Sequence, residues 1–254
     1  MTEQRKRRTT LTSKWKKTKL LIVHDDVKPL IPDTRRFGRS ALKSMLNAYG
    51  MVYVKPDVGT YGNGVIRVER RGTGGYSYQL GTKAVISRDF DSLYGALIKW
   101  TGSRRYLIQK GIHLVKYSGR RFDLRVMVQL SPKGAWETTG LIGRVAHPGK
   151  IVTNYHSGGK LMDVKRLLGA YMSADQMHRT TEQLNRLGVR VARHMHARYP
   201  GLRQIGLDIG FDRTWTPWIL EVNTNPDPYI FNHLSDKSVY RKVMRYRRAA
   251  KRTP

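Results

Sequence analysis

The sequence predicts an α+β fold in which two α+β units are joined by a hinge. Short runs of alternating apolar and polar residues, typical of strands, form one group before residue 109 and a second group after it. Apolar residues at helical spacing accompany each group, over residues 36–49 and 87–100 in the first and over residues 173–199 in the second. Because each sheet must bury one face, we expect helices to cover it and the two sheets to face each other.

The first unit is expected over residues 20–108, after a disordered basic arm. Residues 1–19 contain eight Lys and Arg with only Glu3 as an acid, a composition typical of disorder. One helix is expected from Arg36 to Tyr49, stopped by Gly50, and another from the N-cap Ser87 to Trp100. The expected strands of this unit cover residues 52–55, 65–68, 76–80 and 106–109. The helix residues expected in the core are Phe37, Ala41, Leu42, Met45, Leu46, Phe90, Leu93, Leu97 and Ile98.

The second unit is expected over residues 109–235. Two alternating runs, residues 122–130 and 136–145, are expected to pair, and a Gly-rich functional loop follows at residues 147–162. A long helix over residues 173–199 precedes two more strands, and residues 236–254 form a basic tail with a short amphipathic helix. The apolar residues expected to face inward from the two helices are Met177, Leu184, Leu187, Val191, Met195, Val239, Tyr240, Val243 and Met244.

The last two strands carry a candidate metal site. Residues 206–211 and 218–223 are apolar runs around a short turn, so they are expected to be neighbouring strands. Side chains alternate along a strand, so Glu221 and Asn223 point the same way, and Asp208 can join them from the adjacent strand. Three oxygen donors suit a hard ion such as Mg²⁺. By itself the pattern also fits a half-buried strand with one polar face.

A glycine-rich hairpin carries a candidate phosphate site. Lys55 ends a β-type run, and Gly59, Gly62 and Gly64 lie in the turn before the next alternating run. Glycines allow backbone N–H groups to approach an anion closely, and Lys55 adds a compact positive charge. A Walker or Rossmann loop leads from a strand into a helix, so both are excluded here. An ordinary hairpin loop with a solvated lysine remains the alternative.

Four separated motifs together resemble the ATP-grasp ligases. They are Lys55-Pro56 with its glycine loop, Phe122–Val126, Asn154–Lys160, and Asp208 with Glu221-Val222-Asn223, in the order in which that superfamily has them. The detail is most similar to the YheC/YheD group, named from spore-associated proteins, and Ile31–Thr34 and Leu107–Ile112 add to the similarity. The resemblance spans roughly residues 30–235 and implies an ATP-grasp fold, in which two α+β subdomains clamp a nucleotide.

The resemblance implies roles for individual residues of the cleft. Those that would bind the nucleotide are Lys55, Gly59, Thr60, Gly62 and Gly64 at the phosphates, Gln109, Lys110, Gly111 and Ile112 in the hinge at the adenine, Asp123 at the ribose, and Asn154 near the phosphates. Arg125 would be the catalytic cation at the transferred phosphoryl group, and Asp208, Glu221 and Asn223 would be the metal ligands. As alternatives, Asp123 and Arg125 could form a same-face ion pair, and Asn154 could serve only a turn. Arg144 and Lys160 fit either a substrate contact or a solvated surface.

The activity implied by the resemblance is ATP-dependent ligation. A carboxylate, on a small molecule or a peptide, would be activated as an acyl phosphate and joined to an amine or a similar nucleophile. The cofactors would be ATP and two Mg²⁺ ions, with Mn²⁺ as a substitute. The alternative is a binding or structural protein of a spore or another anionic surface that keeps the architecture without ligation. Relatives usually carry a preceding α/β domain, and about 30 residues stand before Ile31 here, so we expect a partner or the basic termini to present the substrate.

Composition bounds the setting in which the protein works. The chain has 48 Lys and Arg against 18 Asp and Glu, a formal net charge of +30, which favours anionic partners such as nucleic acid or an anionic polymer, bound through the basic termini. The same charge is also compatible with solubility alone. No cysteine is present, so disulfides and cysteine metal sites are excluded. Without an apolar run long enough to span a bilayer we expect a cytoplasmic protein, and the resemblance adds association with spores.

Overall fold

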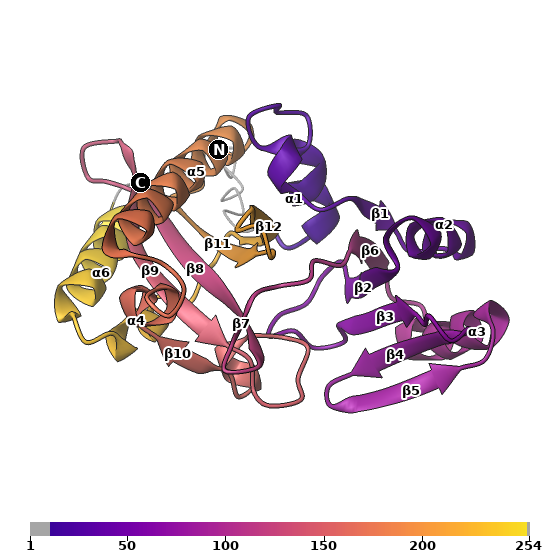
Figure 1. The fold of residues 1–254 in the computed structure, drawn as a ribbon. Helices are drawn as coiled ribbons and strands as arrows, with labels where there is room; N and C mark the ends of the chain where they lie inside the picture. The colour runs from indigo at the N-terminus through magenta and orange to yellow at the C-terminus, as the bar shows by residue number, and fades with distance from the viewer. Residues whose placement is uncertain (1–10, 253–254) are drawn as a thin grey trace, which may run out of the picture.

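The computed structural model describes residues 11–252 and contains two six-stranded sheets that lie side by side (Figure 1). Apart from residues 1–10 and 253–254, every predicted element can therefore be compared with the structure. The strands of the first sheet, in spatial order, are β1 (Thr34–Arg36), β6 (Tyr106–Lys110), β2 (Met51–Pro56), β3 (Ile66–Arg70), β4 (Tyr76–Leu80) and β5 (Lys83–Ser87). Those of the second are β10 (Lys160–Met162), β9 (Trp136–Val145), β8 (Arg120–Leu130), β11 (Gln204–Phe211) and β12 (Pro217–Asn223), with β7 (Lys116–Tyr117) paired to β8.

Two helices cover one face of the first sheet and leave the other face to the cleft. The helices α2 (Arg39–Tyr49) and α3 (Phe90–Thr101) pack on Val52 and Val54 of β2, both fully buried. Because side chains alternate along β2, Tyr53 and Lys55 project from the opposite face. The predicted hairpin of β2 and β3 is confirmed, and its antiparallel register pairs Val54 with Ile66.

A long helix covers the second sheet. The helix α5 (Ala174–Arg198) begins with a capping box, in which Ser173 and Gln176 exchange side-chain and backbone hydrogen bonds, so the predicted helix over residues 173–199 is confirmed. Its apolar side packs on Phe122, Leu124, Val126 and Val128 of β8. The short helix α4 (Val164–Leu168) extends the same core, and the predicted pairing of β8 with β9 is also confirmed.

The opposite face of the second sheet is divided between the cleft and a second helical cover. There α6 (Lys237–Arg252) and the 3₁₀ turn η3 (Tyr229–His233) pack on Met127 and Ile142 through Val243 and Phe231. The tail predicted over residues 236–254 is therefore helical through Arg252, and it belongs to the second unit. Among residues 11–252, no helix combines the length and the apolar composition that crossing a bilayer requires.

The predicted disordered arm is wrong for its last residues. Helix α1 (Lys14–Leu21) begins there, because Ser13 caps it by accepting a hydrogen bond from the Lys16 N–H and donating its hydroxyl proton to Asp57. Residues 1–10 of that arm lie outside the described part of the chain.

The predicted boundaries also shift. Leu21 and Val27, expected in the first unit, are buried in the core of the second, which includes the 3₁₀ turn η1 (Lys28–Leu30) at its margin. Gln109 and Lys110 belong to β6 of the first sheet, so the hinge starts only after them.

Several short elements were not predicted, and two helix starts are later than expected. Gly38 is the extended N-cap of α2 because residues 34–36 pair with β6 as strand β1. Asp89, not Ser87, caps α3, because Ser87 is the last residue of β5. The strands β1, β5, β7 and β10 have two to five residues each and depend on pairing partners, which local sequence does not reveal.

Candidate functional site

A cavity of about 430 Å³ lies between the two sheets. Its walls come from β2 and β6 on one side and from β8, β9, β11 and β12 on the other, with the loops at residues 59–63 and 151–156 between them. Six Lys or Arg and four Asp or Glu line it, so the cavity carries a positive balance that suits an anionic ligand. The lining residues that the sequence predicted are Lys55, Gly59, Thr60, Gly62, Gln109, Lys110, Ile112, Asp123, Arg125, Asn154, Asp208, Glu221 and Asn223.

Strand register places the polar residues of the second sheet on one face. Asp208 of β11 lies opposite Glu221 of β12 on one side and opposite Arg125 of β8 on the other. Directly opposed residues project to the same face, and Asn223, two residues beyond Glu221, joins them as predicted. The intervening Val222 is buried in the core.

A bulge in β12 brings one further side chain to the cavity. The pairing of β11 with β12 shifts between Asp208 and Ile209, so Leu220 has no partner on β11. As a result Leu220 and Glu221, adjacent in sequence, both line the cavity, while Ile219 and Val222 on either side are in the core. The bulge thus supplies an apolar wall next to a carboxylate.

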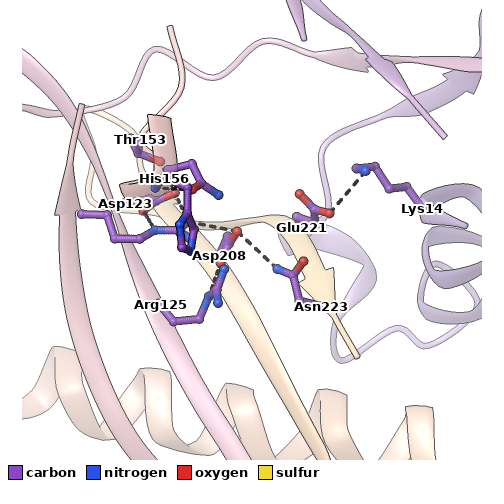
Figure 2. Close-up of polar contacts among 10 residues, drawn as sticks. Lys14, Asp123, Arg125, Thr153, His156, Asp208, Glu221 and Asn223 are labelled. Atoms are coloured by element: carbon purple, nitrogen blue, oxygen red, sulfur yellow. Dashed lines mark hydrogen bonds and ion pairs between the residues drawn. The ribbon is translucent and has the colours of Figure 1, made fainter. Parts of the chain in front are cut away.

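Buried charges form a connected network across β8, β9 and β11. The Nε atom of Arg125 lies 2.6 Å from Asp208, and Arg144 holds Asp123 with two hydrogen bonds of 2.8 and 2.6 Å while also reaching Asp208 at 2.9 Å. Thr153 donates its hydroxyl proton to Asp123 at 2.6 Å. Asn223 donates to the second oxygen of Asp208 at 3.3 Å, as Figure 2 shows. The network thus links both carboxylates to the two arginines through hydrogen bonds and ion pairs.

The pKa values of the network follow from these contacts. Burial raises the pKa of Asp208, but Arg125 and Arg144 outweigh it and hold the pKa at about 2. Burial lowers the pKa of Arg144, and Asp123 and Asp208 together raise it above its ordinary value. Asp208 and Arg144 are therefore charged at neutral pH.

Asp123 and Arg125 do not form an ion pair with each other, which was the alternative prediction for these two residues. Asp123 pairs with Arg144, and Arg125 pairs with Asp208. For Arg144 the sequence allowed either a substrate contact or a solvated surface position. In the structure its side chain is buried and only 4% exposed. Its strand position opposite Asp123 was the signal, because residues paired across β8 and β9 share a face. Lys160 is exposed and lies outside the cavity wall.

Glu221 faces a cation from the N-terminal helix. The Nζ atom of Lys14 lies 3.5 Å from Glu221 (Figure 2). It also donates a hydrogen bond of 2.9 Å to the carbonyl oxygen of Gly59. Lys14 therefore connects β12 with the glycine loop of the other sheet. The sequence placed it in a disordered arm and so missed it.

The donor set fits Mg²⁺ held partly by a nucleotide. Asp208 and Glu221 supply carboxylate oxygens, and Asn223 supplies an amide oxygen on the same face. Within residues 11–252 no cluster of three or more His, Cys, Asp or Glu is poised to hold a metal by itself. Mg²⁺ is commonly bound by one or two carboxylates together with phosphate oxygens and water, which agrees with a site of this composition.

Lys55 faces this group from the first sheet. Its Nζ atom donates a hydrogen bond of 2.5 Å to the side-chain oxygen of Gln109 on the neighbouring strand. Burial lowers the pKa of Lys55 to about 8, with Glu221 as the largest opposing influence. Gln109 was predicted to serve the hinge, but it presents its side chain to Lys55 from within β6.

The glycine loop is held against the second unit. Ser157 donates its hydroxyl proton to the carbonyl oxygen of Tyr61 at 2.6 Å, and a Cβ atom on Gly62 would lie 3.1 Å from the side chain of Val152. Gly62 has φ +74°, a conformation that favours glycine. Gly64 has the same φ but packs on the hydroxyl of Tyr106 and does not line the cavity.

The hinge forms the apolar end of the cavity. Ile112 and Leu114 line it with Tyr53 and Leu220. Gly111 instead donates its N–H to the Met51 carbonyl oxygen, at a point where a Cβ atom would collide with Met51, and so it does not line the cavity. The ammonium of Lys110 lies over the rings of Tyr49 and Trp218.

The Gly-rich segment supplies another wall. Asn154 lines the cavity and also caps the 3₁₀ turn η2 (Tyr155–Ser157), accepting a hydrogen bond from the His156 N–H at 2.9 Å. It therefore serves a turn, and its role near the phosphates stays a prediction. His156 lies 3.2 Å from Asp227, and its ring is tilted against that of Tyr61, with ring centres 4.5 Å apart. Sequence reasoning missed Thr153, His156, Asp227, Tyr229 and Arg247, all of which line the cavity and come from loops or from the last helix.

Comparisons with known proteins agree with this geometry. The chain is 26% identical over 230 residues to the endospore coat-associated protein YheD of Bacillus subtilis (strain 168), covering 88% of this chain and 50% of that protein. It is 22% identical over 219 residues to the endospore coat-associated protein YheC of the same organism, covering 85% and 60%. The chain thus spans about half to three fifths of the length of these curated relatives.

A solved structure and a family model agree on the fold. The crystal structure of D-cycloserine synthetase DcsG superposes with a TM-score of 0.58 at 14% identity, over 95% of this chain and 71% of that one. The family model described as YheC/D like ATP-grasp matches residues 7–248. The two facing sheets are thus those of an ATP-grasp fold, and the chain belongs to the YheC/D-like ATP-grasp family.

Proposed function

We propose that the protein is an ATP- and Mg²⁺-dependent ligase that activates a carboxylate as an acyl phosphate and joins it to an amine. One observation carries the proposal. Lys55 and the glycine loop of the first sheet line the same cavity as Asp208, Glu221 and Asn223 of the second. A magnesium triphosphate needs both kinds of group, cations and N–H donors at its phosphates and oxygen ligands at its metal.

The nucleotide would lie along the cavity with its base at the hinge. Tyr53, Ile112, Leu114 and Leu220 form an apolar slot for the adenine. Lys55 and the backbone of residues 59–63 would contact the phosphates. Mg²⁺ held by Asp208, Glu221 and Asn223 would neutralise charge on the phosphate oxygens. Arg125, fixed by Asp208, would contact the transferred phosphoryl group.

The proposed reaction depends on holding the carboxylate and the γ-phosphate of ATP in position more than on acid–base catalysis by side chains. An oxygen of the substrate carboxylate attacks the γ-phosphorus, the bond to the β–γ bridging oxygen breaks, and ADP leaves. An amine nitrogen then attacks the acyl carbon, phosphate leaves, and the nitrogen releases one proton to solvent. Closing the glycine loop against residues 151–158 excludes water from the acyl phosphate, and the contact between Ser157 and Tyr61 supports such closure.

The test is ADP release with ATP and Mg²⁺ over a panel of carboxylates and amines. The wild-type protein is compared with the double variant Asp208→Asn, Glu221→Gln, and mass spectrometry identifies the product. We expect substrate-dependent ADP release in the wild type only, lower by at least about 100-fold in the variant. Equal release from both proteins, or no binding of Mg²⁺ with the analogue AMP-PNP to the wild type, would refute the ligase.

A binding role at an anionic surface is the second candidate, and the outer face of α6 favours it. Arg241, Arg245 and Arg248 are exposed on that helix, and the relatives YheD and YheC are named for association with the endospore coat. Such a role predicts salt-dependent retention on an immobilised polyanion. Retention that is unchanged by Asp208→Asn with Glu221→Gln, together with absent ADP release, would favour this candidate over the ligase. A spore-associated location belongs to the same proposal.

A further inference from the structure

The cavity contains a region that the nucleotide and metal roles leave unassigned. It is formed by the loop after β12, including Asn225 and Asp227, by Tyr155 and Tyr229, and by Arg247 of α6. Arg247 follows Val239 and Val243 at intervals of four residues, and Val243 is fully buried against the sheet. Residues at this spacing share one side of a helix, so α6 turns Arg247 toward the sheet and the cavity.

Arg247 has an unsatisfied donor. Its Nη1 atom is buried and has no hydrogen-bond acceptor among residues 11–252, and its guanidinium lies 5.5 Å from the ring centre of Tyr229. Arg247 as a whole is half-buried, but a buried donor atom without an acceptor is costly, and water or a ligand commonly satisfies such an atom. A ligand oxygen beside the Tyr229 ring could accept this hydrogen bond.

The acids that line the cavity are already engaged elsewhere. Asp123 and Asp208 are held by Arg144 and Arg125, and Glu221 faces Lys14. The fourth acid, Asp227, lies beside His156. No carboxylate within the described residues forms an ion pair with Arg247, so an anionic group of a ligand could pair with its guanidinium.

A short segment connects this region with the phosphoryl site. Pro226 and Arg125 both lie against Gly206, where a Cβ atom would meet Pro226 at 2.7 Å and Arg125 at 3.0 Å. Three residues after Pro226, Tyr229 contacts Arg247. Arg125 and Arg247 line the same cavity, so a molecule that lies in it can contact both.

We propose that Arg247 binds a second, non-reacting anionic group of the carboxylate substrate, so that the preferred substrate is a small dicarboxylate-type molecule. This inference rests on the ligase proposed above and names its substrate class. Arg247 holds one carboxylate through its free N–H, and the other carboxylate reaches the phosphoryl group beside Arg125. Charge-assisted hydrogen bonds from a guanidinium are strong and directional, which would give selectivity over monocarboxylates.

Binding of simple carboxylates to the nucleotide-loaded protein tests the inference. The full chain is saturated with Mg²⁺ and AMP-PNP, so that the phosphate-binding cations are occupied, and succinate or propionate is titrated by saturation-transfer NMR. We expect succinate to bind more tightly than propionate. Arg247→Gln should weaken succinate by about tenfold or more and leave propionate and AMP-PNP unchanged. Arg247→Lys should lie between, which separates loss of charge from misfolding.

The matched control is Arg248→Gln, which removes the same charge from the exposed side of the same helix. The inference would be overturned if Arg248→Gln weakened succinate binding as much as Arg247→Gln, or if Arg247→Gln left succinate binding unchanged. Neither result would affect the proposed nucleotide site. A parallel loss of AMP-PNP affinity in Arg247→Gln would also overturn it, because Arg247 would then be a phosphate contact. Failure of the wild type to bind AMP-PNP would instead refute the ligase itself, and the inference with it.

Discussion

Replacing Asp208 by Asn should lower the free energy of unfolding, because Asp208 forms buried ion pairs with Arg125 and Arg144. The asparagine keeps a hydrogen-bond acceptor near Arg125 but leaves Arg125 and Arg144 with one carboxylate, Asp123, between them. The Asp208 side chain is only 10% exposed, so water screens the uncompensated charge poorly.

The magnitude follows from the depressed pKa of Asp208. The arginines outweigh burial and lower the pKa from 3.8 to about 2, and each pKa unit corresponds to about 1.4 kcal/mol. Because the folded-state pKa is the lower one, this stabilisation is complete above pH 3.8 and is lost as the pH falls through about 2. At pH 7 the free energy of unfolding should therefore fall by about 2–3 kcal/mol, close to the range of about 3–5 kcal/mol for breaking a buried ion pair.

Urea denaturation at pH 7, followed by far-ultraviolet circular dichroism, measures this change. The midpoint should fall by about 1 M at unchanged slope. Glu182→Gln is the matched control, because it breaks an exposed pair with Arg186 at 3.9 Å and should change the free energy of unfolding by less than about 0.5 kcal/mol. Adding Arg125→Gln to Asp208→Asn restores charge balance and should recover part of the loss. A midpoint for Asp208→Asn equal to that of Glu182→Gln would refute the reasoning.

Two further predictions concern the first sheet and its loop. Burial lowers the pKa of Lys55 to about 8, so between about pH 8 and 10.5 the unfolded chain binds more protons and stability should rise with pH. A bound phosphate would favour the charged form of the Lys55 amine, so binding of Mg²⁺ with AMP-PNP at pH 9 should take up a proton. Calorimetry would detect this uptake as a binding enthalpy that depends on the buffer, and Lys55→Met should abolish that dependence. Proton uptake that persists in Lys55→Met would contradict the prediction. Gly62→Ala and Gly74→Ala both place alanine at positive φ, but only the first brings a Cβ atom within 3.1 Å of Val152. Each should lower stability by about 1 kcal/mol, and only Gly62→Ala should weaken AMP-PNP binding severalfold, whereas equal effects would exclude a role for the contact between the loops.

Local patterns were sufficient for the longer elements. The hairpin of β2 and β3, the paired strands β8 and β9, and helix α5 follow from periodicity and turn residues that lie within each segment. The same holds for the shared face of Asp208, Glu221 and Asn223, because alternation along a strand is a property of the backbone.

Contacts between distant segments decided the rest. Lys14 reaches the cavity because α1 packs on the second core and Ser13 hydrogen-bonds to Asp57 of the first unit, which no local pattern of a basic segment reveals. Arg144 and Arg247 became cavity residues only when β9 paired with β8 and α6 packed on the sheet. The bulge that turns Leu220 inward likewise needed a partner strand.

The sequence by itself determined the strand alternation, the helix faces and the lysine-plus-carboxylate motifs, since these depend on backbone geometry over a few residues. Tertiary structure alone decided which charges meet. The pairing of Arg125 with Asp208 and the open donor of Arg247 depend on register and packing between residues far apart in the chain, and electrostatic energies change strongly over a few ångströms in a buried site.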